Sequence, residues 1–170
     1  RSSNVAVASA FPAVGAVCPW VSADGAVVTQ SWDAGADYGE ALLALLDRGI
    51  SLPTAAEAFV AGRAGSVGLQ LHGIDAEGRT YAHTGEKCVE HADHYVGDEY
   101  TVGGDLLASA EVIDAVAAAF ERSTGRFTDR LLTALEASES AGGDKRGDNL
   151  SAAVLVHAPE SKLYHNLRVD

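Results

Sequence analysis

The segments of helical periodicity in this 170-residue chain come in pairs, and this pairing limits the folds open to it. One pair is predicted over residues 38–48 and 51–61 and the other over residues 109–123 and 127–138, because apolar residues recur there every three or four positions. Strand-like segments precede, separate and follow the two pairs. Simple β-α-β units would alternate single helices with single strands, so we expect an α+β protein whose antiparallel sheets carry helices on their outer faces.

The expected strands are short, rich in Val, Ala and Thr, and separated by turn residues. They are predicted at residues 4–9, 17–22, 25–32, 67–74, 79–84, 100–102, 151–157 and 163–169. The rest of residues 85–104 is an irregular polar stretch, which is typical of a functional or mobile loop. Ser51 and Ser109 are expected to cap helices, and Gly49 and Gly62 to end them.

Composition and charge indicate one domain and exclude some partners. Hydrophobic residues make up 47% of the chain, and neither a linker nor an internal repeat divides it, so residues 1–170 are expected to form a single domain. The net charge of -12 repels phosphates and argues against nucleic acid. No apolar run reaches the roughly 18 residues of a membrane span, so no membrane partner is expected.

The cysteines and the chain start bear on location and completeness. Cys18 and Cys88 are too few for a disulfide framework, so a reduced cytoplasmic location is expected, although one bridge between them stays open. The chain has no Met and runs from Arg1 straight into a strand. We therefore expect a missing or processed amino terminus, and a missing tail after Asp170.

Several motifs occur in order along nearly the whole chain. They are NVAVASAFPAVGAVCPW at residues 4–20, GAVVTQ at 25–30, AHTGEKC at 82–88, VGGDLLAS at 102–109 and GGDKRG at 142–147 followed by SAAVLV. Together they resemble the N-terminal-nucleophile (Ntn) hydrolase-like family catalogued as domain of unknown function 1028. The resemblance implies a four-layer αββα sandwich, in which two antiparallel sheets are flanked by helix pairs.

The resemblance also implies a chemistry. In Ntn hydrolases the first residue of the mature chain is a Thr, Ser or Cys, whose side chain attacks while its own α-amine, with a pKa of about 8, acts as the base. Arg1 has no such side chain, so the nucleophile is expected upstream of residue 1, on a first strand that the resemblance implies ahead of this sequence. The expected substrate is a small-molecule or peptide amide, and no cofactor is implied. Exposed sheet edges in such a fold leave a homo-oligomer possible.

Three residues are candidates to support this chemistry. Ser9 ends the strand that should lie beside the nucleophile and could bond its hydroxyl or amine. Arg146 could bind a substrate carboxylate through two N–H groups, and Asp144 could orient Arg146 or the α-amine. The alternatives are a Ser that bonds its own turn and two solvated charges in a Gly-rich loop.

Asp105 departs from the family pattern. The family has Asn where this chain has Asp105. An Asn amide can donate to a developing oxyanion, whereas an ionised Asp only accepts. Asp105 would therefore act protonated or serve another purpose, and it favours a second hypothesis: a ligand-binding module that keeps the fold but has lost the chemistry.

Further candidates carry weaker signals. Thr29 ends a strand, His83 closes another, and Trp20 could form a wall of the pocket. Core packing for Trp20 and a backbone hydrogen bond for His83 are the simpler interpretations. Cys18 lacks a nearby base in the sequence, which favours a buried structural thiol.

The polar stretch supports a third hypothesis. The spacing of His83, Cys88, His91 and His94, with Asp93 among them, could hold a zinc ion. The family resemblance implies no metal, and a solvated acidic loop is the alternative.

Overall fold

The computed structural model describes residues 2–35, 37–158, 160 and 163–170. The described helices are α1 (Tyr38–Leu46), α2 (Leu52–Ala61), α3 (Glu111–Arg122) and α4 (Phe127–Ser140). The strands are β1 (Ser3–Ser9), β2 (Pro19–Val21), β3 (Gly25–Gln30), β4 (Gln70–Asp75), β5 (Thr80–Thr84), β6 (Asp93–Gly97), β7 (Tyr100–Gly104), β8 (Ser151–Ala158) and β9 (Leu163–Val169).

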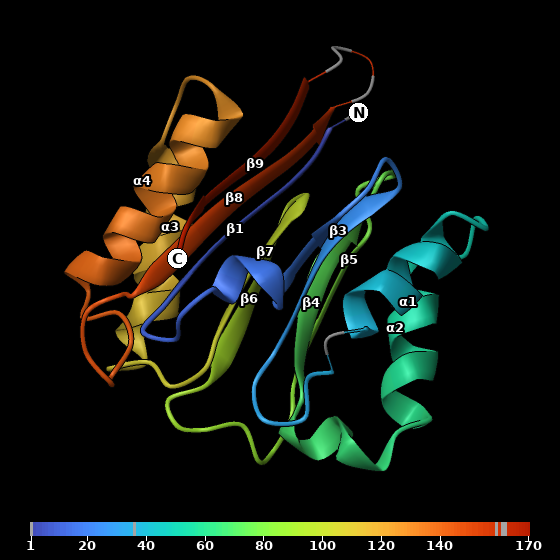
Figure 1. Cartoon of the computed structure of the whole chain (residues 1–170), viewed down its shortest axis with the longest axis horizontal. Coiled ribbons are helices and arrows are strands. Elements are labelled where there is room, and N and C mark those ends of the chain that lie inside the picture. The colour runs from blue at the N-terminus through green and yellow to red at the C-terminus, as the bar shows by residue number, and fades with distance from the viewer. Residues whose placement is uncertain (1, 36, 159, 161–162) are drawn as a thin grey trace.

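The strands form antiparallel sheets, which confirms the α+β class. One sheet has the order β1-β8-β9, a second has the order β2-β3-β4-β5, and β6 and β7 form a hairpin. Figure 1 shows α1 and α2 on one side of the strands and α3 and α4 on the opposite side. The register of β1 with β8 pairs Ser9 with Ser151, so the end of β1 adjoins the start of β8.

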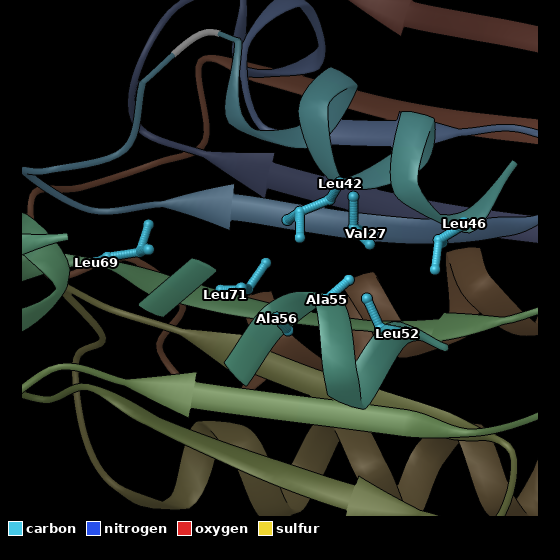
Figure 2. Close-up of a cluster of buried hydrophobic side chains, with 8 residues drawn as sticks. All are labelled: Val27, Leu42, Leu46, Leu52, Ala55, Ala56, Leu69 and Leu71. Atoms are coloured by element: carbon cyan, nitrogen blue, oxygen red, sulfur yellow. The ribbon is translucent and has the colours of Figure 1, made fainter. Parts of the chain in front are cut away.

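Strand β3 of the sheet β2-β3-β4-β5 is apolar on both faces. Val27 and Leu71 point toward α1 and α2 and pack on Leu42, Leu46 and Leu52, as Figure 2 shows. Ala26 and Val28 flank Val27 on β3 and point the other way, because successive strand residues alternate between faces. Because both faces of β3 are buried, its sequence begins with the unbroken apolar run GAVV instead of alternating apolar and polar residues.

The second sheet is covered on both faces as well. Val5, Val7 and Leu155 pack on Ala26 and Val28, which joins the two sheets. On the opposite face of β8, Val154, Val156 and Ala158 pack with Leu131 of α4. Helix α4 therefore packs on this sheet, whereas α3 packs on the β6–β7 hairpin through Val112 and Ile113, which contact Val102.

The hairpin of β6 and β7 lies where an irregular stretch was predicted, with only residues 100–102 as a strand. Side chains on β6 are mostly exposed and polar, so the sequence carries no buried strand pattern there. The hairpin is fixed instead by one buried amide, because Gln70 Nε2 on β4 donates to the carbonyl oxygens of Asp93 and Gly104, each at 3.0 Å. These two residues face each other across the hairpin.

Local signals at the helix ends have mixed outcomes. Ser51 caps α2 as predicted, since its Oγ accepts from Thr54 N–H at 3.3 Å. Ser109 does not cap α3. The helix begins at Glu111, and the residue before it is Ala110, which has helical φ and ψ angles and no side chain that could cap the helix.

The two cysteines are free thiols. No helix among the described residues combines the length and apolarity that crossing a membrane requires.

Candidate functional site

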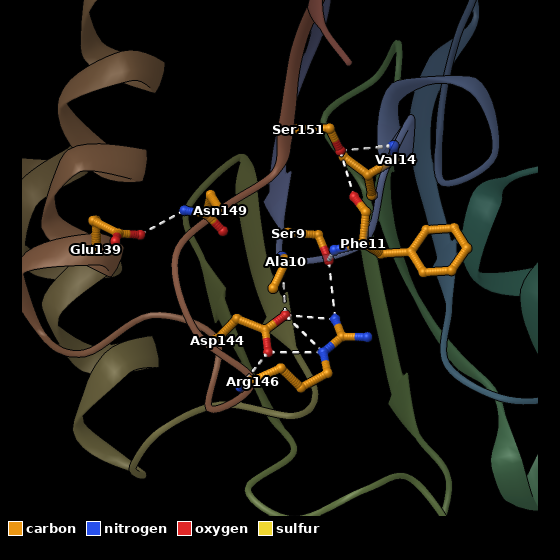
Figure 3. Close-up of polar contacts among 9 residues, drawn as sticks. All are labelled: Ser9, Ala10, Phe11, Val14, Glu139, Asp144, Arg146, Asn149 and Ser151. Carbon is orange, nitrogen blue, oxygen red and sulfur yellow. Dashed lines mark hydrogen bonds and ion pairs between the residues drawn. The ribbon is translucent and has the colours of Figure 1, made fainter.

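Ser9, Asp144 and Arg146 come together although more than 130 positions separate the first from the others. Arg146 Nε donates to Asp144 Oδ1 at 2.9 Å, and Arg146 Nη2 donates to Asp144 Oδ2 at 2.5 Å. Nη2 also donates to Ser9 Oγ at 3.1 Å. Figure 3 shows the guanidinium lying between the carboxylate and the hydroxyl. The structure thus joins three residues that the sequence singled out separately.

The loop between α4 and β8 supplies Asp144 and Arg146. Gly142, Gly143 and Gly147 adopt φ values of 112, 56 and 131 degrees, which side chains rarely allow, so the loop needs glycine there. Asp144 also accepts from its neighbours' backbone: Arg146 N–H donates to Oδ1 at 2.9 Å and Ala10 N–H to Oδ2 at 3.2 Å. The carboxylate therefore fixes both the loop and the turn that follows β1.

That turn is held from the other side by Ser151. Its hydroxyl donates to the carbonyl of Phe11 at 2.6 Å and accepts from Val14 N–H at 2.9 Å. Leu150 N–H donates to the carbonyl of Ser9 at 2.8 Å. The hydroxyl of Ser9 is left to accept from Phe11 N–H and Arg146, so its position is determined by rigid neighbours.

Asp105 lies on a loop bonded to the same Gly-rich segment. Lys145 N–H donates to the carbonyl of Leu106 at 2.8 Å, and Ala108 N–H donates to the carbonyl of Gly143 at 2.9 Å. These backbone bonds, one on each side of Leu107, bring the half-buried Asp105 into the electrostatic field of Asp144 and Arg146.

The two carboxylates titrate in opposite directions. Burial raises the pKa of Asp105 and the charge of Asp144 raises it further, which outweighs the lowering by Ser31 and Arg146. Burial also disfavours the charged form of Asp144, but hydrogen bonds from Arg146 and the backbone outweigh it and lower the pKa of Asp144. Asp144 is thus the anion of the site, and Asp105 is the carboxyl that takes up a proton more readily.

A cavity of about 1060 Å³ opens beside these residues. It is lined by every residue of β1 and by every residue from Glu99 to Leu107, which includes β7. Side chains alternate between the faces of a strand, so a cavity that touches every residue lies along the strand's edge. Within the described residues β1 pairs only with β8, and β7 only with β6, so both strands turn a free edge to this space.

The cavity contains buried hydroxyl groups without partners. Thr29 is fully buried and lines the cavity, and among the described residues its Oγ1 has no hydrogen-bond partner. Ser31 Oγ, whose residue adopts a φ of 77 degrees, is buried beside the Asp105 carboxyl, whose pKa it lowers, but it makes no hydrogen bond of regular geometry in the described residues. Unpaired buried hydroxyls are costly, so such groups are typical of places where a ligand or another segment binds.

The other candidates lie apart from this site. Trp20 packs with the residues beneath α1 and α2, and His83 Nε2 lies 2.9 Å from the carbonyl of Ser66. Neither lines the cavity. Cys18 does line it, but burial, together with Asp105, raises the pKa of its thiol to about 11, so the thiol stays protonated at neutral pH.

The residues of the proposed zinc loop do not converge. Across residues 2–35, 37–158, 160 and 163–170, no group of three or more His, Cys, Asp or Glu side chains is placed to hold a metal ion. His94 Nδ1 instead lies 2.8 Å from Thr84 Oγ1, and Asp93 Oδ1 accepts from the N–H of His94.

Sequence reasoning missed His72, Phe11 and Trp32. His72 lines the cavity from β4, and burial, with His94 nearby, lowers its pKa to about 4. Phe11 and Trp32 are 53% and 74% exposed, and both line the cavity. Phe11 and Trp32 each lie two positions after the polar end of a strand, Ser9 or Gln30, and this was the available signal.

The fold and the site define an α+β protein with a polar cluster at one end of a cavity between two free strand edges. The chain belongs to the family of unknown function DUF1028, whose model matches residues 1–170. It is similar to the crystal structure of protein SPO2555 from Silicibacter pomeroyi, a DUF1028 member, with a TM-score of 0.91 and 28% identity over 99% of this chain and 73% of that one. No curated protein matches.

Proposed function

We propose that this chain is the body of an Ntn-type amide hydrolase with the αββα layering of that class. Its nucleophile would be the hydroxyl or thiol of a Thr, Ser or Cys that precedes residue 1 in the native protein. The observation that carries the proposal is the cavity between the free edges of β1 and β7, with Ser9, Asp144 and Arg146 at one end.

The cavity has the setting of a missing strand. Neighbouring strands lie about 4.8 Å apart, and a strand inserted between β1 and β7 would satisfy the free backbone groups of both. The helix pair α3 and α4 already packs over both sides of the gap, since Leu131 of α4 contacts the β8 cluster and Val102 of β7 packs with Val112 and Ile113 of α3.

Such a strand would begin near Ser9. A segment joined to β1 by a tight turn ahead of Ser3 would run antiparallel to β1. Its start would then lie opposite the far end of β1, which is Ser9. An amino-terminal residue would thus meet the hydroxyl of Ser9, the carboxylate of Asp144 and the unpaired hydroxyls of Thr29 and Ser31.

The reaction then follows the class. The α-amine takes the proton of the attacking hydroxyl or thiol, whose oxygen or sulfur bonds to the amide carbon. The C–N bond breaks as the amine passes that proton to the leaving nitrogen. Water adds to the remaining acyl bond and releases the acid, restoring the free side chain. Ser9 would orient the amine, and a protonated Asp105 would donate to the developing oxyanion.

A ligand-binding module is the second candidate, and Asp105 favours it. An ionised carboxylate beside the reacting carbonyl would oppose the negative charge that develops there. In that case the cavity and the Arg146 pair would bind a small molecule without cleaving it.

The native amino terminus tests the proposal. Intact mass and amino-terminal sequencing of the full native protein are expected to show an exposed Thr, Ser or Cys. Replacing that residue with Ala should abolish amide cleavage while the fold, measured by circular dichroism, is kept. A native terminus without a hydroxyl or thiol would rule out hydrolysis by this route and leave the binding module.

A further inference from the structure

One nitrogen of the Arg146 guanidinium, Nη1, is free to donate hydrogen bonds to a ligand. Nε and Nη2 are engaged by Asp144 and Ser9, whereas Nη1 makes no hydrogen bond within the part of the chain that the structure describes. In Figure 3 this nitrogen points away from Asp144, toward the side of the view on which the Phe11 ring lies. The Arg146 side chain is 40% exposed, whereas that of Asp144 is 9% exposed, so the guanidinium is held firmly and still reachable.

Two aromatic side chains, Phe11 and Trp32, line the same cavity as Arg146. Phe11 N–H bonds Ser9 Oγ, the same oxygen that accepts from Arg146. Trp32 follows Ser31 in the chain. The Ser31 hydroxyl lowers the pKa of Asp105, and so does the positive charge of Arg146. Both rings are more than half exposed and line the cavity, so each can contact a ligand there without displacing another side chain.

We propose that Arg146, Phe11 and Trp32 form a receptor for a small carboxylate that carries an apolar or aromatic substituent. Both N–H groups of Nη2 are taken by Asp144 and Ser9, so Nη1 supplies its two N–H groups to the ligand's carboxylate. The exposed rings contact the substituent. Among the charged side chains that line the cavity, Arg146 is the single cation in the described residues, so the ligand's carboxylate has one place to bind.

This receptor names the substrate class of the proposed hydrolase, and that step rests on the proposed function. The substrate is an amide with a free carboxylate near an apolar group, such as an N-acyl amino acid. Asp105 lowers the affinity for such a ligand when it is ionised, because its negative charge repels a second carboxylate beside Arg146.

Binding by calorimetry to the full native protein tests the receptor without requiring cleavage. The probe is 4-phenylbutanoate, compared with 4-phenylbutanamide and butanoate. We expect the amide and the ring-free acid each to bind at least tenfold more weakly. Arg146→Gln should weaken 4-phenylbutanoate at least tenfold and Trp32→Ala about fivefold, while Asp105→Asn should tighten it. The control Arg126→Gln changes an exposed Arg outside the cavity and should change nothing.

The outcomes separate the two proposals. Equal affinity for acid and amide, or binding unaffected by Arg146→Gln, would overturn the receptor whatever the enzyme does. Selective binding of 4-phenylbutanoate without cleavage of N-acyl amino acids would keep the receptor and count against hydrolysis. Cleavage of amides that lack a carboxylate, with no preference for those that have one, would keep hydrolysis and overturn the receptor.

Discussion

The carboxylate of Asp144 accepts hydrogen bonds both from the guanidinium of Arg146 and from the backbone of the turn that follows β1. The Nε–Oδ1 distance is 2.9 Å, and Ala10 N–H reaches the other oxygen at 3.2 Å. One carboxylate thus sets the position of the site's cation relative to the end of β1.

Asp144→Ala should destabilise the protein by about 2 kcal/mol, because it removes a nearly buried acceptor of backbone and guanidinium N–H groups. Urea unfolding measures the loss. The matched control is Asp129→Ala, which breaks an Arg–Asp pair whose side chains are 83% and 48% exposed. It should cost less than about 0.5 kcal/mol; equal losses in the two variants would contradict the role given to Asp144.

Gln70→Leu should loosen the β6–β7 hairpin more than the rest of the molecule. The fully buried Gln70 amide satisfies the carbonyls of Asp93 and Gly104, and each carbonyl left unpaired costs about 1–3 kcal/mol. Hydrogen exchange followed by mass spectrometry should show faster exchange in residues 93–104 than in β8. Uniform acceleration across the chain would show that Gln70 supports global stability only.

Stability should fall between about pH 6.5 and pH 4 because of His72. Burial lowers its folded pKa from 6.5 to about 4, so in this range the unfolded chain takes up a proton that the folded chain does not. The free energy of unfolding therefore decreases as pH falls, by up to about 3 kcal/mol. His72→Leu should flatten this dependence, and NMR titration of the wild-type ring should give a midpoint near 4. A midpoint near 6.5 would contradict it.

Gly39→Ala should destabilise the protein, although the same change inside an exposed helix is normally favourable by about 1 kcal/mol. A Cβ on Gly39 would lie 1.9 Å from the Trp20 ring, so the ring must move. The expected signature is a lower melting temperature together with a shift in Trp fluorescence. A melting temperature unchanged or raised would show that Trp20 does not pack on α1 as described.

Periodicity predicted the elements whose faces are buried in a regular pattern. The residues of α1, α2 and α4, the Ser51 cap and the full extent of β9 follow from spacing and from local signals. β6 was not predicted, because its residues are exposed and its position depends on Gln70, a contact across the fold that no local pattern reveals.

The candidate site was predicted in parts. Ser9, Asp144 and Arg146 could be selected as polar residues at strand ends and in a Gly-rich loop, and the structure brings them together. Trp20 lies away from the cavity because its face of β2 packs against α1. The sequence could not predict this, since the three residues of β2 are too few to reveal which face is buried against the helix. Among the described residues, Nη1 of Arg146 is free because the carboxylate of Asp144 binds Nε and Nη2 instead, and this arrangement exists only in the folded chain.

Covalent trapping shows whether an amino-terminal nucleophile reacts at this site. The full native protein is treated with an electrophilic acyl probe, digested, and mapped by mass spectrometry. We expect one adduct, on the amino-terminal residue of the native chain, and at least tenfold less of it in Asp144→Ala. An adduct on Cys18 or Cys88 alone, or none while N-acyl amino acids are still cleaved, would contradict it.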